Sequence, residues 1–139
     1  MIEQITKTFK AISDETRIRI INLFIKSNEK ICVCELMDAL KLPQYKISKA
    51  LGVLKNSRLL TYEKEGLWAY YKLNKTKENL LLFNFLKNYL SDDVMKEDEK
   101  RLEQRLLLRE NNRCVIGVIP ENKLKKIIKE KQKNIDFSG

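Results

Sequence analysis

Two cysteines, Cys32 and Cys34, stand one residue apart in the segment ICVCEL, and the chain has one further cysteine, Cys114. Thiolates bind soft metal and metalloid ions, and neighbouring thiols can also be oxidised to a disulfide. Cysteine is, in addition, one of the residue types most often found fully buried in protein cores. The pair is therefore part of a metal or metalloid site, a redox pair, or two small apolar side chains of a packed helix.

The number and type of available ligands favour one kind of ion. Three thiolates match trivalent arsenic or antimony, which accept three sulfur ligands, better than zinc, which takes four. Cys32 and Cys34 would provide two of these thiolates, and Cys114 the third, from the same subunit or from a partner. The chain contains no histidine, which excludes His-containing zinc sites and a histidine general base. No glycine-rich phosphate loop occurs either, so the sequence does not indicate an enzyme.

The balance of charge indicates the class of partner. The 139 residues include 28 Lys and Arg against 19 Asp and Glu, a formal net charge of +9. Such an excess attracts polyanions, and nucleic acid is the first candidate. No segment approaches the length of a membrane span and no signal peptide is recognisable, so we expect a cytoplasmic protein without a membrane partner. Thiols are kept reduced there, and an odd number of cysteines argues against a disulfide framework.

The elements that must position the cysteines are helices. Apolar residues at helical spacing predict a helix over residues 11–28, N-capped by Ser13, and then two shorter helices. The first of these covers residues 31–42 and includes both cysteines of the pair. The second begins at Pro43, which is acceptable in a first turn. Two short helices joined by a tight turn, the second of them basic, form the helix-turn-helix pattern.

The position of the cysteine pair within this motif predicts how a ligand could act. In an intact helix over residues 31–42, residues two apart are separated by about 200°, so Cys32 and Cys34 face nearly opposite ways. Their sulfurs would converge only if this turn became extended, because side chains two apart then share one side. Unwinding the first helix of the motif would displace the second helix. The expected consequence is that binding at the thiols lowers the affinity for DNA.

After the two short helices, the spacing of apolar residues along the sequence changes. The segment LLTYEKEGLWAYYKLN, residues 59–74, alternates apolar and polar side chains and is rich in aromatic residues, which predicts a β-hairpin that turns at Glu65 and Gly66. A hairpin after the second helix of a helix-turn-helix is the wing of a winged helix. An amphipathic helix is then predicted from a cap at Asn74, which residues 91–93 could interrupt, and its apolar stripe continues to about Asn111. Its acidic residues between 92 and 99 are expected on the surface.

These elements define the predicted domain organisation. Residues 1–112 are expected to form a mostly α-helical winged helix-turn-helix with a β-hairpin wing, for DNA binding and dimerisation. A domain of this size cannot bury so much helical apolar surface alone, which predicts a homodimer through the terminal helices. Residues 113–139 are expected to be a C-terminal extension with Cys114, a short β-like run and a basic amphipathic segment.

The second helix of the motif and the wing carry the residues expected to contact DNA. Residues 41–64 contain six Lys or Arg and one acidic residue, Glu63. Gln pairs with adenine, Lys with guanine or phosphate, and Ser with either, and the first turn of such a helix contacts base edges. The predicted DNA-binding residues are Gln44, Tyr45, Lys46, Ser48 and Lys49 on the helix and Lys64 on the wing.

Taken in order, the segments ISDETRIRII, ICVCEL, LPQYKISKALGVLKNSRLL and EKEGLWAYYKL resemble the ArsR/SmtB family of metal- and metalloid-responsive winged-helix repressors. The resemblance covers roughly residues 5–75. It implies a homodimer that binds operator DNA and leaves it when an inducer binds. ICVCEL matches the Cys-Val-Cys metal box of the family, which implies Cys32 and Cys34 as ligands, and NNRCVIGV resembles the C-terminal stretch of some arsenic-responsive members, which adds Cys114.

The sequence also departs from the family pattern at two places. Some arsenic-responsive members have a third cysteine three residues after the second one, and this chain has Met37 there. The family's recognition helix often reads Ser-Gln-Ser, whereas Pro43 and Tyr45 replace the two serines here. The bases that this helix would read are therefore not given by the resemblance.

The function predicted from the sequence is that of a metalloid-responsive transcriptional repressor. It would bind double-stranded operator DNA as a homodimer and be released when As(III) or Sb(III), as inducer, binds Cys32, Cys34 and Cys114, with no cofactor required. A repressor that responds to oxidants or sulfide through the same thiols is the alternative. A constitutive DNA-binding protein with inert thiols is a third interpretation.

Overall fold

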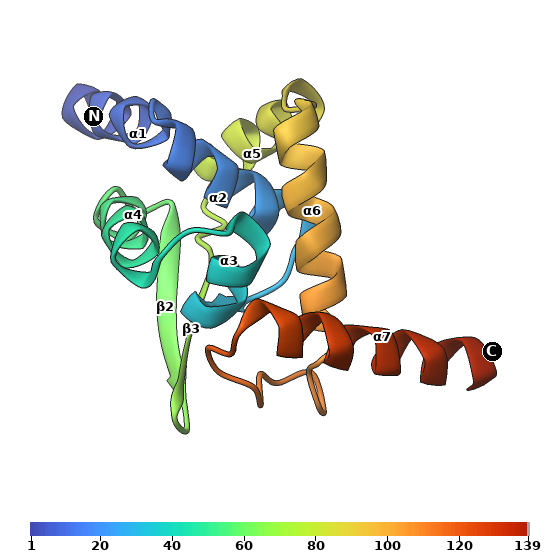
Figure 1. Ribbon diagram of the computed structural model, residues 1–139. Coiled ribbons are helices and arrows are strands. Elements are labelled where there is room, and N and C mark those ends of the chain that lie inside the picture. The colour runs from blue at the N-terminus through green and yellow to red at the C-terminus, as the bar shows by residue number, and fades with distance from the viewer. Residues whose placement is uncertain (139) are drawn as a thin grey trace.

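The computed structural model describes residues 1–138, which form seven α-helices around a small antiparallel sheet (Figure 1). The sheet has the strand order β1-β3-β2. The elements are α1 (Ile2–Ile12), α2 (Glu15–Ser27), β1 (Ile31–Cys32), α3 (Val33–Leu40), α4 (Gln44–Asn56), β2 (Leu60–Glu65), β3 (Trp68–Leu73), α5 (Lys77–Tyr89), α6 (Asp93–Leu106) and α7 (Glu121–Ser138). The predicted class, a mostly helical winged helix-turn-helix, is confirmed.

The helix-turn-helix consists of α3 and α4. Lys41, in the left-handed region at φ 54°, ends α3, and α4 begins three residues later, at Gln44. The inward face of α4 carries Ile47, Leu51 and Leu54, which are fully buried in the core. The wing is the β2–β3 hairpin, and Gly66, at φ +60°, provides the backbone conformation that its turn requires.

The start of α3 differs from the prediction. Residues 31 and 32 form a short strand, β1, that pairs with the wing strand β3 through Ile31↔Tyr71 and Cys32↔Tyr70. Cys32 has extended backbone angles, φ −95° and ψ 166°, and is the N-cap of a helix that begins at Val33. The helix predicted from residue 31 was therefore wrong in its first two residues, because pairing with a strand some forty residues away overrides the local helical pattern.

Other helix starts also lie one or two residues from their predicted positions. Asp14, whose side chain accepts from the Arg17 amide, caps α2 in place of Ser13. Thr76 caps α5 in place of Asn74. Each observed cap has an acceptor oxygen aligned with a free helix amide, which the spacing of apolar residues alone does not specify.

The predicted long helix is divided into α5 and α6 at residues 90–92, and α6 ends at Leu106 rather than near Asn111. Helix α6 packs against α2 and α3 of the same chain. Asp98, expected on the surface, is instead fully buried and forms ion pairs of 2.8 Å with Arg19 and with Arg101. Helices α1 and α5 each keep several exposed large apolar side chains.

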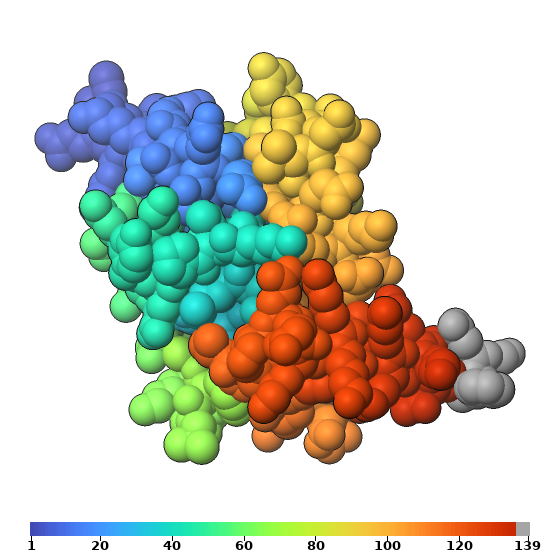
Figure 2. Space-filling model, in the orientation of Figure 1, coloured from blue at the N-terminus to red at the C-terminus, as the bar shows by residue number. Residues whose placement is uncertain are grey.

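The C-terminal extension returns to the body of the domain. Residues 114–119 form no strand, so the predicted β-like run was wrong; the nearest bridge joins Glu110 and Arg113. Helix α7 starts beside α3, where Glu121 pairs with Lys41, and runs away from α4 (Figures 1 and 2). Among the described residues, no helix has both the length and the apolar character needed to cross a membrane.

Candidate functional site

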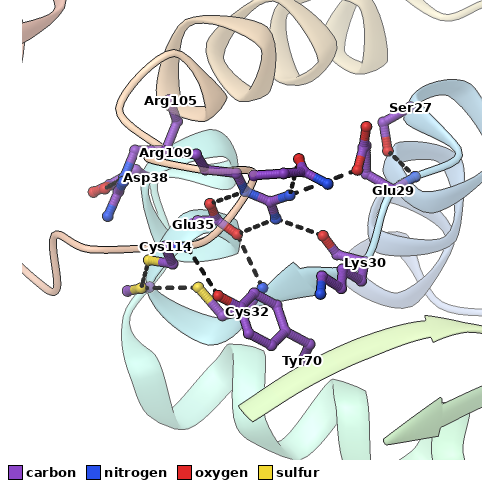
Figure 3. A network of polar contacts seen from close by, with 12 residues as sticks. Ser27, Glu29, Lys30, Cys32, Glu35, Asp38, Tyr70, Arg105, Arg109 and Cys114 are labelled. Carbon is purple, nitrogen blue, oxygen red and sulfur yellow. Dashed lines mark hydrogen bonds and ion pairs between the residues drawn. The ribbon is translucent and has the colours of Figure 1, made fainter. Parts of the chain in front are cut away.

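The three cysteines lie together in one buried cluster. The Sγ atoms of Cys32 and Cys34 are 3.1 Å apart, those of Cys34 and Cys114 are 3.5 Å apart, and all three lie within 4.8 Å of one another. Their exposed fractions are 2%, 6% and 1%. One cysteine comes from β1, one from the first turn of α3 and one from the extension, so the cluster joins three segments of the chain (Figure 3).

The extended conformation of Cys32 explains why its sulfur meets that of Cys34. A residue before the helix is not bound to the 100° rotation per residue, so the two side chains reach the same place although the helix after them is intact. The expectation that this turn must unwind before both sulfurs meet was therefore wrong. The three sulfurs lie together while α3 is intact from Val33 to Leu40.

Glu35 fixes the junction between β1 and α3. Its Oε1 accepts a hydrogen bond of 3.1 Å from the Cys32 amide, as in a capping box. Arg109 donates to both carboxylate oxygens, at 2.7 and 2.8 Å, and also to the Lys30 carbonyl. The Glu35 side chain is fully buried and that of Arg109 is 4% exposed. This bidentate pair therefore connects the extended residue Cys32 to the segment that follows α6.

The segment that carries Cys114 is held by a second set of contacts. The Cys114 amide donates a hydrogen bond of 2.8 Å to the Tyr70 hydroxyl, on the wing strand β3. Arg105, with 1% of its side chain exposed, donates to the Ile116 carbonyl and forms an ion pair of 2.6 Å with Asp38 of α3. These contacts place Cys114 against the other two thiols.

The three thiols differ in the direction of their pKa shifts. Hydrogen bonds donated by Cys32 and Cys34, followed by the nearby Arg105 guanidinium, lower the pKa of Cys114 to about 3. The hydrogen bond between Cys34 and Cys114 raises the pKa of Cys34 to about 12. The hydrogen bond between Cys32 and Cys114 is the main cause that raises the pKa of Cys32. The two S–H donors and the buried Arg105 cation therefore favour the thiolate form at Cys114 over the other two cysteines.

The ligand set fits a three-coordinate thiophilic ion. Among residues 1–138, the three cysteines are the one group of Cys, His, Asp and Glu side chains close enough to share an ion. They offer three sulfur atoms, one fewer than a structural zinc site needs. Trivalent arsenic and antimony, by contrast, are saturated by three thiolates.

Sequence reasoning missed the residues that assemble this cluster: Glu35, Asp38, Tyr70, Arg105 and Arg109. One local signal was present. Glu35 follows Cys32 by three residues, the spacing of a capping box, which would have placed Cys32 before the helix instead of within it. The arginines gave no such signal, because their partners are about seventy residues away in the sequence.

The predicted DNA-binding residues form an outward-facing surface. Gln44, Tyr45, Lys46, Ser48 and Lys49 are all exposed on α4, and Lys64 is exposed on β2 of the wing. Tyr45 has 70% of its surface exposed although it is a large aromatic residue. The ammonium group of Lys55 lies 5.0 Å from the Tyr62 ring centroid, which links the end of α4 to the wing. That these six residues contact DNA stays a prediction.

Comparisons with known proteins identify relatives of the chain. The family described as "Bacterial regulatory protein, arsR family" matches residues 14–62. An arsenic resistance transcriptional regulator of Pseudomonas putida is 48% identical over 66 residues, which cover 48% of this chain and 56% of that protein. The arsenical resistance operon repressor of Bacillus subtilis is 34% identical over 82 residues, which cover 59% of this chain and 77% of that protein.

A solved structure has the same fold. HlyU from Vibrio cholerae superposes with a TM-score of 0.57 at 24% identity, over 63% of this chain and 91% of HlyU. The match with the Pseudomonas regulator spans little more than half of that protein's length. The relatives named here are regulators of transcription and none is an enzyme.

The Glu35–Arg109 pair generates a stability prediction. Replacing Arg109 by Met leaves the buried Glu35 carboxylate without its cation, so we expect the free energy of unfolding in urea to fall by about 3–5 kcal/mol. The double variant Arg109→Met with Glu35→Gln should recover part of this loss, because no uncompensated charge remains. A double variant less stable than Arg109→Met alone would contradict this account of the pair.

Proposed function

The chain belongs to the ArsR family of bacterial regulatory proteins, and from this premise we propose that it is a transcriptional repressor that trivalent arsenic or antimony releases from its operator. The observation that carries the proposal is the buried cluster of Cys32, Cys34 and Cys114, whose sulfurs lie within 4.8 Å of one another. The names of the related proteins from Pseudomonas and Bacillus agree with an arsenical inducer.

The position of the cluster supports a mechanism by which inducer binding would lower the affinity for DNA. Cys32 pairs with Tyr70 of the wing strand, and the Cys114 amide donates to the hydroxyl of the same tyrosine. Cys34 lies in α3, which packs directly against α4. Three bonds to one central atom would replace the present S–H contacts and change the spacing of these segments. The wing and α4 would then move away from the arrangement that fits DNA, without any unwinding of α3.

An exposed apolar face supports a homodimer. On α1, Ile5 and Phe9 are 48% and 55% exposed, and on α5, Leu81 and Phe85 are 72% and 58% exposed. Their side chains line one groove of about 750 Å³. So much apolar surface on one face of a small domain is typical of an interface, and a second copy would cover it symmetrically. Helix α7 is not part of this face.

We expect arsenite or antimonite to release the reduced protein from its operator in a fluorescence-anisotropy titration. Cys32→Ser and Cys34→Ser should still bind the operator but no longer respond, because each removes a bond to the ion. Hydrogen peroxide serves as the third titrant. Release by peroxide but not by arsenite would contradict the proposal and favour a redox regulator.

The α4 surface generates a prediction about salt dependence. If Lys49 contacts a phosphate, Lys49→Ala should weaken operator binding and lower the slope of log affinity against log salt by about 1. Lys133→Ala makes the same charge change on α7, at the other end of the molecule, and should leave the slope unchanged. Equal effects of the two variants would contradict a specific phosphate contact of Lys49 and would show that operator binding depends only on net charge.

The exposed face generates a prediction about assembly. Phe85→Asp places a charge in the apolar groove, so we expect the dimer to dissociate in sedimentation velocity and operator affinity to fall. Val115→Asp, at another exposed apolar position, is the matched control and should remain dimeric. A wild-type protein that is monomeric at micromolar concentration would refute the dimer.

A further inference from the structure

A groove of about 450 Å³ lies between α3, α6 and the first half of α7, and the proposed function leaves it unused. None of the three cysteines lines it. Its volume is within the range of pockets that hold small organic molecules. Helix α7 begins beside α3 and crosses the C-terminal end of α6 before it leaves the body of the domain (Figure 1). The groove therefore receives side chains from three helices.

Helix α6 contributes polar side chains that have no partner. Lys100 and Gln104 both line the groove, and they lie four residues apart, so they are neighbours on one face of the helix. Within residues 1–138, neither side chain forms a hydrogen bond or an ion pair. An ammonium group and a side-chain amide are thus available to bind an acceptor in the groove.

The other cations of the groove already have carboxylate partners. These ion pairs are Lys41 and Lys125 with Glu121, Arg105 with Asp38, and Arg101 with Asp98. Among the described residues that line the groove, one ammonium group is left, and it fits a head group with one negative charge better than a phosphate dianion. A carboxylate also has a second oxygen, which can accept from the side-chain amide of Gln104.

The rest of the groove has an apolar lining. It is formed by Met37 of α3, Ile119 of the extension, and Leu124 and Ile128 of α7. Leu124 is 8% exposed, whereas the other three are only half-buried. A hydrocarbon chain along these side chains would remove more of their apolar surface from water, which is favourable. We propose that the groove is a binding site for medium-chain fatty acids, with the carboxylate at Lys100 and Gln104 and the tail along this apolar lining.

A fatty acid in the groove would fasten α7 and the extension to the domain. The first turn of α7 is attached by the ion pair of Glu121 and Lys41, whose side chains are 60% and 59% exposed. Such an exposed pair contributes little stability. The groove also reaches Arg105, which holds the Cys114 segment through the Ile116 carbonyl. The ligand would therefore stabilise the docked extension without occupying the thiol cluster.

The first test compares fatty acids with a cation of the same chain length. In isothermal titration calorimetry below the micelle concentration, decanoate should bind at one site per chain. The affinity should rise about threefold to fourfold with each methylene from hexanoate to decanoate, because each added group is buried. Decyltrimethylammonium should bind at least about tenfold more weakly, because its head group repels Lys100. Equal affinities for the two head groups, or no dependence on chain length, would overturn the proposal.

Matched variants of α6 test the position of the head group. Lys100→Ala should weaken decanoate binding about fivefold. Lys96→Ala makes the same charge change on α6 but outside the groove, and should have no effect. Glu97→Gln should strengthen binding about twofold, because this carboxylate lines the groove and has no ion pair within residues 1–138. Equal effects of the two lysine variants would mean that decanoate responds only to net charge, and the site would be refuted.

Matched variants of α7 test the position of the tail. Ile128→Asp places a charge in the apolar lining and should weaken decanoate binding at least about tenfold. Ile127→Asp is the control, since Ile127 is also half-buried but does not line the groove. Phe85→Asp, in the groove between α1 and α5, should leave binding unchanged. Loss of binding in Phe85→Asp but not in Ile128→Asp would place the fatty acid in that other groove and exclude the site on α7.

Hydrogen exchange of the wild-type chain provides a measurement that needs no variant. Decanoate should slow amide exchange in the first half of α7, because the ligand fastens this helix to α3 and α6. Unchanged exchange there, with decanoate bound, would be evidence against the site. None of these measurements involves DNA or arsenite, so their outcome is independent of the proposed function.

Discussion

The buried carboxylate of Glu35 is the group on which the arrangement of this protein depends. It accepts hydrogen bonds from the amide of Cys32 and from Nε and Nη2 of Arg109, and none of its side chain is exposed. A carboxylate taken out of water needs such compensation, since an unpaired buried charge is strongly destabilising. These hydrogen bonds connect the junction of β1 and α3 to the segment after α6. The three thiols meet at that junction.

Arginine provides most of these long-range links. Arg19 and Arg101 converge on Asp98, Arg105 binds Asp38, and Arg109 binds Glu35. The pairs formed by Arg19, Arg105 and Arg109 join α6, or the segment just after it, to α2 or α3. The pair of Arg101 and Asp98 lies within α6. The planar, permanently charged guanidinium can form two aligned bonds to a carboxylate, which suits it to a partly dry interface. The extension that carries Cys114 is positioned by the same kind of contact.

The thiol cluster lies between the wing sheet and the helix-turn-helix. Cys32 belongs to a strand of the wing sheet and Cys34 to the helix before α4. A short S–H contact tolerates small changes in spacing, whereas covalent bonds to one central atom do not. An ion bound by all three sulfurs would therefore change the relative position of these elements, as the proposed function requires.

The sequence by itself determined the helix-turn-helix, the wing and the outward face of α4, because helical and strand periods are local and survive in a single chain segment. It also determined which thiols were available, and it predicted an ion with three sulfur ligands. The tertiary structure decided that Cys32 lies before the helix, that Cys114 joins the pair and that Asp98 is buried. These features depend on strand pairing and ion pairs between residues about forty to eighty positions apart, for which the spacing of apolar residues contains no signal. The two closely spaced cysteines of the segment ICVCEL were thus visible at once, but only the folded chain shows that their sulfurs already meet.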